Sequence, residues 1–213
     1  MTARKIPMLF SKPMVLALLA GRKTQTRRLR FAGKPGDLIW VRESWRTYVS
    51  LDGEKPSRVW TPDGTRGAAI FYEAGGDQFI SKPPHALEWS QSDESEHPGA
   101  GKLRPSMFLP AWGSRLTLKV TEVRRVTLHE ISEADARAEG CPISAAGVPY
   151  DPPEPQIDSW QGYARASYAL LWSQLNGADS WQANPTVSVV SFEVARENIL
   201  SFTMEKEEPS CAF

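Results

Sequence analysis

Residues Arg115 to Leu128 read RLTLKVTEVRRVTL, and this stretch has the clearest strand pattern in the chain. Leu116, Leu118 and Val120 alternate with polar residues, as in a strand that buries one face. At Val123 the apolar positions change parity, which indicates a bulge or bend of the kind that occurs where a sheet curls into a barrel. The stretch therefore predicts a long strand in a curled sheet.

Stretches on both sides of this strand extend the pattern. Further strands are predicted at residues 37–45 (DLIWVRESW), 68–72 (AAIFY) and 186–194 (TVSVVSFEV). Helices are predicted at residues 13–20, 132–139 and 159–175. Ser132 and Asp135 have the spacing of a capping box at the start of the second helix. Several strands with few helices favour an α+β fold, a small mixed β-barrel decorated with short helices and long loops, over a doubly wound sheet.

Long polar or proline-rich segments separate these elements. Residues 75–105 predict a long excursion loop, and residues 142–155 predict a proline-rich loop. We expect a single domain at residues 1–196 that carries a long insertion at about 46–112. A flexible C-terminal tail is expected at residues 197–213.

The composition limits the classes of protein that this chain can represent. Its 25 Lys and Arg residues balance 25 Asp and Glu residues, which argues against a large basic surface for nucleic acid. Cys141 and Cys211 are the only cysteines, and their separation predicts free thiols in a reducing compartment. No signal peptide fits the N-terminus, and no run of roughly 18 apolar residues predicts a membrane span. We therefore expect a cytoplasmic protein that does not contact a membrane, and we assume a monomer because the sequence does not indicate an oligomeric state.

Common cofactor and metal motifs are missing from the sequence. His85, His97 and His129 are isolated, and no His, Cys and carboxylate cluster has the spacing of metal ligands. The sequence has no phosphate-binding loop, no dinucleotide fingerprint and no nucleophile elbow. It therefore predicts neither a cofactor nor a metal.

The stretch Gly21–Arg28 (GRKTQTRR) places two threonines among four cations. Burial and positive neighbours would lower the pKa of Lys23 from about 10.4, and a fall of about 3 units would let it act as a base at pH 7. Such a lysine could deprotonate Thr24 or Thr26 to give a hydroxyl–lysine nucleophile pair. The same residues also fit a helix C-terminus with solvated cations.

Two clusters combine aromatic and polar side chains that could bind a flat base. In the first, two tryptophans could stack a base while an arginine or a glutamate reads its edge. The second mixes serine, tryptophan and arginine just before the long strand. The candidate residues of both clusters are Trp40, Arg42, Glu43, Trp45, Ser106 and Arg115. Core packing with a surface ion pair, and a structured loop end, explain the same residues equally simply.

At these residues the sequence resembles the ASCH family, a branch of the PUA-like β-barrels, and in particular ASCH proteins often found in phage and prophage genomes. The resemblance covers most of residues 6–195. The matching segments are Gly21–Arg28 with the helix before it, Pro35-Gly36-Asp37 with the strand to Trp45, Arg104-Pro105-Ser106, Leu116–Glu139 and Asn184–Phe192.

The resemblance implies a PUA-like barrel and an amide-hydrolysing site. Small bacterial ASCH enzymes hydrolyse the amide of N4-acetylcytidine with a lysine, a threonine and a glutamate, which fall by motif on Lys23, Thr26 and Glu139. Thr26 would attack the acyl carbonyl, Lys23 would take its proton or stabilise the oxyanion, and Glu139 would orient Lys23 and assist the departing amine. Residues 46–112 and 142–158 have no counterpart in those enzymes.

The predicted function is thus an amidohydrolase that acts on N4-acylated cytidine or a related modified nucleoside. Arg22, Thr24 and Arg28 are expected to bind the substrate together with the residues of the two aromatic clusters. Two alternatives stay open. One is a non-catalytic RNA-binding module, as other PUA-like barrels are, and the other is a ribonuclease, an activity ascribed to some ASCH proteins. In each case the expected partner is a nucleoside, an RNA base or RNA.

Overall fold

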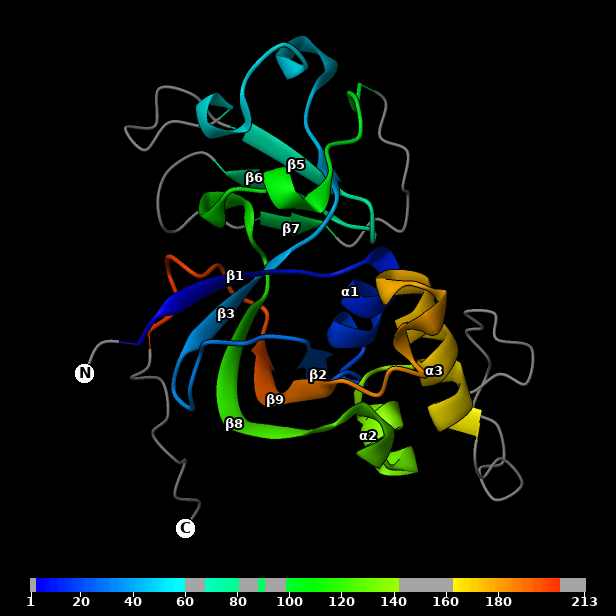
Figure 1. Ribbon diagram of the computed structural model, residues 1–213. Coiled ribbons are helices and arrows are strands. Elements are labelled where there is room, and N and C mark those ends of the chain that lie inside the picture. The colour runs from blue at the N-terminus through cyan, green and yellow to red at the C-terminus, as the bar shows by residue number, and fades with distance from the viewer. Residues whose placement is uncertain (1–2, 60–67, 81–87, 91–98, 142–162, 204–213) are drawn as a thin grey trace. The chain divides into compact units, whose positions relative to one another are not determined.

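The computed structural model describes residues 3–59, 68–80, 88–90, 99–141 and 163–203 (Figure 1). The chain divides into two compact units, each built from three segments. Unit 1 comprises Met1–Ile6, Phe10–Ile39 and Leu118–Val194, and unit 2 comprises Pro7–Leu9, Trp40–Thr117 and Ala195–Phe213. The predicted single domain at 1–196 therefore contributes residues to both units, and its status as one domain stays a prediction.

Strands outnumber α-helices in the described residues. The strands are β1 (Lys5–Leu9), β2 (Gln25–Arg28), β3 (Leu38–Arg42), β4 (Trp45–Arg46), β5 (Ala68–Tyr72), β6 (Asp77–Ile80), β7 (Glu88–Ser90), β8 (Thr117–Thr127) and β9 (Thr186–Ala195). The α-helices are α1 (Lys12–Leu19), α2 (Glu133–Ala138) and α3 (Tyr163–Asn176). Single turns of 3₁₀-helix are η1 (Val49–Leu51), η2 (Pro56–Arg58), η3 (Ser106–Phe108), η4 (Ala111–Gly113), η5 (Leu128–Glu130) and η7 (Ala178–Ser180).

The larger sheet has five strands in the order β1-β3-β8-β9-β2. Its central strand, β8, is the long strand predicted from residues 115–128, and Figure 1 shows that it curves strongly. In the described part of the chain β1 and β2 end the order without pairing to each other, so the sheet does not close into a barrel. The α+β class is confirmed, with a mixed architecture of one five-stranded sheet and few helices.

The smaller sheet lies in unit 2 and corrects the loop predicted at residues 75–105. It has the order β4-β5-β6-β7, with antiparallel pairing between β5 and β6 and between β6 and β7. Gly75 and Gly76 have φ angles of 85° and 80°, which permit the tight turn from β5 into β6. A Gly-Gly pair after an apolar strand is a hairpin signal, and the polar composition of the following residues obscured it.

Most predicted elements agree with the structure, but two strands outside the predicted loop were missed in addition to β6 and β7 within it. β3, β5, β8, β9 and all three helices overlap their predicted ranges, although the predicted start of the third helix at 159–162 lies outside the described residues. β2 was not predicted because it is short and all of its residues are polar or charged, whereas β1 is short and contains a proline. β2 lies in the cationic stretch after the first helix, where no strand was predicted.

Unit 1 buries one face of each helix. Helix α1 buries Met14, Val15, Ala17 and Leu18, and it ends before Gly21, whose φ of 70° suits a residue just past a helix. A cluster of buried side chains joins α2, α3 and the start of β9, and Figure 1 shows these elements close together. Its members are Leu128, Ile131, Ala136, Cys141, Ala164, Tyr168, Trp172 and Val187.

Unit 2 has a hydrophobic core of its own, formed largely by the predicted insertion. Its buried members are Trp45, Val59, Ile70, Tyr72 and Leu109. The start of the predicted tail also differs from expectation, because Asn198 and Ile199 are buried. The side-chain amide of Asn198 donates to the carbonyls of Ala111, Trp112 and Ser114, which fixes this segment within unit 2. Residues 204–213 lie outside the described residues.

No helix in the described ranges is both long enough and apolar enough to cross a membrane.

Helix α2 begins with the predicted capping box. Ser132 Oγ accepts a hydrogen bond from the Asp135 backbone N–H at 3.0 Å, and Asp135 Oδ2 accepts from the Ser132 N–H at 3.3 Å. These bonds satisfy backbone donors that the first turn of a helix leaves without partners. The cap therefore sets where this six-residue helix starts and, through its length, where Glu139 lies.

Replacing the cap of α2 tests this assignment. Ser132→Ala is expected to lower the free energy of unfolding by about 1 kcal/mol, because it removes the side-chain acceptor. Ser11→Ala is the matched control, since Ser11 is the N-cap of α1 but makes no side-chain capping bond. Urea unfolding followed by circular dichroism measures both variants. Equal losses of stability in the two variants would contradict the role of the capping bond.

Candidate functional site

The backbone after α1 brings the predicted motif to the end of α2. Lys23 and Glu139 form an isolated antiparallel bridge, although 116 residues separate them. The Thr24 N–H donates to the Ala138 carbonyl at 2.8 Å, and the Thr24 carbonyl accepts from the Phe192 N–H at 2.9 Å. The motif is therefore held between α2 on one side and β9 on the other, entirely within unit 1.

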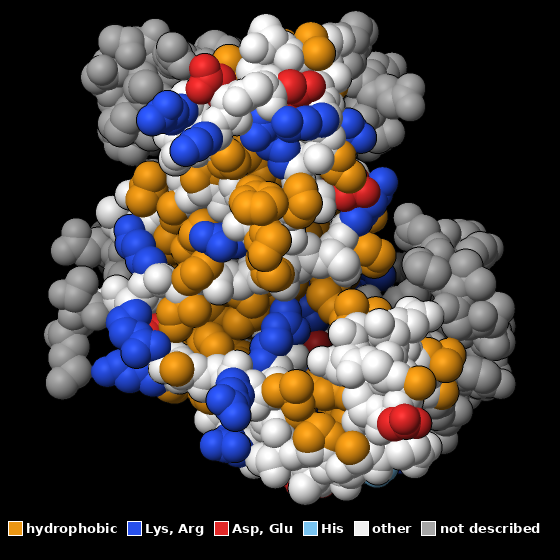
Figure 2. Space-filling view, turned by 45° about the horizontal axis from the view of Figure 1, so that its top comes forward, with side chains coloured by type: hydrophobic (Ala, Val, Ile, Leu, Met, Phe, Trp, Pro, Cys, Tyr) orange, Lys and Arg blue, Asp and Glu red, His pale blue; other side chains and the backbone are white. Residues whose placement is uncertain are grey.

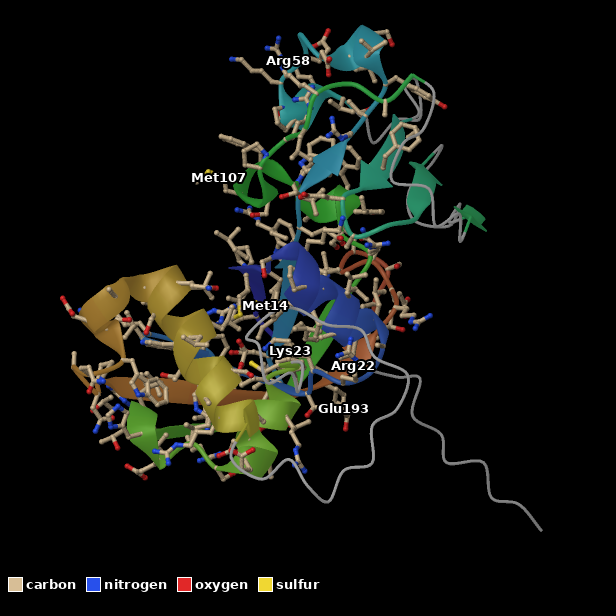
Figure 3. The ribbon with its side chains drawn as sticks, turned by 90° about the vertical axis from the view of Figure 1, so that its right-hand side faces the viewer. Met14, Arg22, Lys23, Arg58, Met107 and Glu193 are labelled. Carbon is tan, nitrogen blue, oxygen red and sulfur yellow. The ribbon has the colours of Figure 1, made fainter. Side chains whose placement is uncertain are left out.

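The side chains of Lys23 and Glu139 form a buried ion pair. Lys23 Nζ lies 2.9 Å from Glu139 Oε2 and 2.8 Å from the Glu139 backbone carbonyl. The exposed fractions of the two side chains are 0% and 3%. Figure 3 shows Lys23 inside unit 1, whereas the neighbouring Arg22 is at the surface. The structure thus brings the predicted lysine and glutamate together.

Arg27 occupies the other oxygen of the same carboxylate. Arg27 Nη1 donates to Glu139 Oε1 at 3.1 Å, and Nη2 donates to Asp135 Oδ2 at 3.0 Å. Asp135 also accepts from Gln25 Nε2 and from Arg124 Nη2. The Arg27 guanidinium lies 5.9 Å from the centre of the Tyr168 ring. These contacts build a buried charge network between β2, α2 and α3.

The sequence analysis missed Arg27, Gln25, Asp135 and Tyr168 as parts of this site. A signal for the first three was present. In an extended chain Gln25 and Arg27 share a face, and on a helix Asp135 and the residue four positions later share another. Because β2 was expected to be a loop, no common face was assigned to its residues. Tyr168 carried no such signal.

Thr26 and Arg28 alternate with Gln25 and Arg27 along β2 and contact each other. Arg28 Nη1 donates to Thr26 Oγ1 at 2.7 Å and to the Arg27 carbonyl at 3.0 Å. The Arg28 guanidinium also lies 5.3 Å from the centre of the Phe10 ring. Thr26 is fully buried, and Arg28 is half-buried. The recorded partner of the threonine hydroxyl is therefore Arg28, and within the described ranges no hydrogen bond joins it to Lys23.

Burial controls the protonation of this site. Burial lowers the pKa of Lys23 below its usual range, Glu139 opposes that shift, and Arg28 adds to it. Burial raises the pKa of the Cys141 thiol to about 12, so that this neighbour stays neutral. Burial also raises the pKa of the Tyr168 hydroxyl. Burial also lowers the pKa of Arg28, so Lys23 is one of two cations at this site whose protonated form burial disfavours.

The remaining predicted contact residues are divided between the two units. Arg22 and Thr24 belong to unit 1 and are exposed. The others lie in unit 2, where Trp45 is a fully buried core residue and Ser106 belongs to η3. The residues of the two aromatic clusters that fall in unit 2 are Trp40, Arg42, Glu43, Trp45, Ser106 and Arg115. Their role in binding a base stays a prediction.

Glu43 and Arg115 form a buried ion pair. Arg115 Nε and Nη2 donate to the two oxygens of Glu43 at 2.8 and 2.7 Å. Arg115 Nη1 donates to the Gly75 carbonyl, and the guanidinium lies 4.0 Å from the centre of the Tyr72 ring. Arg42 lies 4.5 Å from the centre of the Trp40 ring and donates to the Met107 carbonyl. These contacts stabilise unit 2.

No protein-family model, curated protein or solved structure matches this chain. The resemblance to the ASCH family therefore stays a prediction from its motifs. In the parts of the chain that the structure describes, no group of three or more His, Cys, Asp or Glu side chains is placed to hold a metal ion.

Gly140 allows the two halves of the site to approach each other. Its φ is 78°, and a Cβ atom there would lie 2.7 Å from Ala17 Cβ and 3.0 Å from Lys23 Cβ. Any larger residue would push α1 and Lys23 away from the end of α2.

Gly140→Ala is therefore expected to destabilise the protein more than Gly21→Ala. Gly21 has a similar φ of 70° but open space around the added methyl group, so it reports the backbone strain alone, about 1–2 kcal/mol. The clash at Gly140 should add about 1–3 kcal/mol. Urea unfolding of both variants measures the difference. Equal destabilisation would show that close packing at Gly140 is unimportant.

Proposed function

We propose that this chain is an amidohydrolase that removes the acyl group from N4-acylated cytidine or a related modified nucleoside, on a PUA-like fold of the ASCH type. One observation carries the proposal. Lys23 and Glu139, 116 residues apart, form a buried ion pair beside the strand that holds Thr26. A motif lysine, a motif threonine and the predicted glutamate are thus supplied by adjoining elements.

The contacts of these residues suit a threonine nucleophile. Arg28 donates to Thr26 Oγ1, and a cationic donor favours the deprotonated form of a hydroxyl. Lys23, whose pKa is lowered by burial, is the base that would take the threonine proton. Glu139 holds Nζ through both its carboxylate and its backbone carbonyl, which fixes the direction of the lysine side chain.

The reaction would proceed in two stages. In the first, Thr26 Oγ attacks the acyl carbon, its proton passes to Lys23, and the carbonyl oxygen becomes an oxyanion near the Arg28 cation. The bond between the acyl carbon and N4 then breaks, and N4 takes the proton from Lys23 to leave as the free amine. In the second stage water hydrolyses the threonine ester, which releases the carboxylic acid and restores the hydroxyl.

The burial of the motif cations favours chemistry over binding of an RNA backbone. Lys23 and Arg27 are buried and bonded to carboxylates, so they do not form part of an exposed cationic surface. On the face seen in Figure 2, Lys and Arg side chains lie in separate groups with hydrophobic side chains between them. A protein that follows a nucleic-acid backbone instead presents its cations as an exposed stripe or patch.

Near-isosteric substitutions test the three catalytic roles. Thr26→Val, Lys23→Met and Glu139→Gln are each expected to lower the rate of conversion of N4-acetylcytidine to cytidine by about 10²-fold or more, because each removes one step of proton transfer or attack. Chromatography of the nucleosides measures the rate. Thr121→Val, Lys12→Met and Glu122→Gln make the same changes at exposed positions and should leave the rate unchanged.

The outcomes separate the proposal from its alternatives. No cytidine above the level of the Lys23→Met variant would sink the amidohydrolase assignment. If the wild-type protein then binds RNA with an affinity that falls steeply with salt, a binding module is the better description. Thermal unfolding of each variant verifies that a loss of rate is not a loss of fold.

A further inference from the structure

Arg27 is the buried residue of this site that the proposed mechanism does not use. Its side chain is 0% exposed, and its two terminal nitrogens reach Glu139 and Asp135, which are four residues apart at the end of α2. Its Nε atom is buried and has no hydrogen-bond partner among the described residues. An unsatisfied buried donor is costly, so a guanidinium at this position requires a compensating role.

We infer that Arg27 is a positioning residue for the Lys23–Glu139 pair. Its guanidinium neutralises part of the Glu139 charge at Oε1. Oε2 then orients Lys23 without strongly favouring the protonated form of the lysine. Glu139 Oε1 faces Arg27 at 3.1 Å, and Oε2 faces Lys23 at 2.9 Å. A permanent cation on Oε1 weakens the attraction between Oε2 and the protonated lysine. The part of this inference that concerns activity rests on the proposed function, whereas the part that concerns the ion pair does not.

Holding α2 against β2 does not explain Arg27 by itself. Asp135 is also bound by Gln25, which reaches its carbonyl and its carboxylate at 2.9 and 3.1 Å, and by Arg124 at 2.9 Å. The Thr24 N–H adds a backbone bond to α2. Within the described ranges, the bond to Glu139 Oε1 is made by Arg27 alone. Asp135 thus has several ties to its surroundings, whereas the second oxygen of Glu139 depends on one residue.

The charged and titratable groups that act on Lys23 come from three segments of the chain. Glu139 faces it from the end of α2, Arg28 from β2, and Cys141 from the segment after α2. Tyr168 of α3 lies close to Arg27 and stays neutral because burial raises its pKa. Burial has the largest effect on the pKa of Lys23, and the largest opposing effect comes from Glu139, the carboxylate to which Arg27 is bonded.

The decisive experiment follows the protonation of Lys23 directly. In protein labelled with ¹³C at lysine Cε, the Lys23 signal is identified by its loss in Lys23→Met and is titrated by NMR. Arg27→Met should raise the pKa of Lys23 by about one unit, because the full charge of Glu139 then acts on it. Arg27→Lys retains a cation and should give a smaller rise. Arg124→Met is the matched control, since it removes a cation from Asp135 and leaves Glu139 untouched.

A double variant shows whether Arg27 acts through Glu139. In a Glu139→Gln background the Arg27→Met substitution should no longer raise the pKa of Lys23. An unchanged or lowered pKa in both Arg27 variants, or an equal shift in Arg124→Met, would overturn the inference. If Arg27→Met does not fold, the pKa of Lys23 in Arg27→Lys is compared with its pKa in Arg124→Met, and this comparison decides the same point.

The pH dependence of turnover separates this inference from the proposed function. Arg27→Met should move the rising limb of the plot of rate against pH to higher pH. The rate should therefore fall about 10-fold at neutral pH and change little at pH values above the rising limb. A purely structural defect would lower the rate at every pH. If the wild-type protein fails to hydrolyse N4-acetylcytidine, the proposed function falls, while the NMR titration still tests Arg27.

Discussion

The division of one carboxylate between two cations is the interaction on which unit 1 depends. Lys23 and Arg27 each take one oxygen of Glu139, and all three side chains are buried. Removing one partner of a buried ion pair costs about 3–5 kcal/mol, because the remaining charge is stranded away from water. The polar strand β2 is therefore able to lie inside the protein only because the end of α2 carries the acids that its cations need.

Several local features serve this pairing. The Ser132 cap sets the start of α2, Gly140 lets its last turn approach α1, and backbone bonds of Thr24 fix the motif between α2 and β9. Small displacements would matter at this pairing, since a charge-assisted hydrogen bond weakens steeply when its atoms move apart.

Much of this arrangement could be predicted from the sequence, and the missing part has a physical explanation. The alternation in β8, the capping box of α2 and the glycine after α1 are local signals, so these elements were found. β2 was missed because its buried residues are polar, and apolar periodicity is the main sign of a strand. The family resemblance predicted that Lys23 and Glu139 belong to one site. Placing Arg27 and Asp135 in that site would have required knowing that β2 and α2 face each other. Partners that lie more than 100 residues apart leave no local trace.

Two sites with buried ion pairs among the described residues show how similar residues serve different ends. In unit 2 one guanidinium binds both oxygens of Glu43, its third nitrogen binds a carbonyl, and the charges balance. At the proposed active site cations outnumber anions when Lys23 is protonated, since Lys23, Arg27, Arg28 and Arg124 face Glu139 and Asp135. A balanced pair contributes rigidity and has no charge to offer a ligand. A surplus of positive charge in a water-poor setting instead favours any reaction whose transition state develops an anion, as attack on an amide carbonyl does.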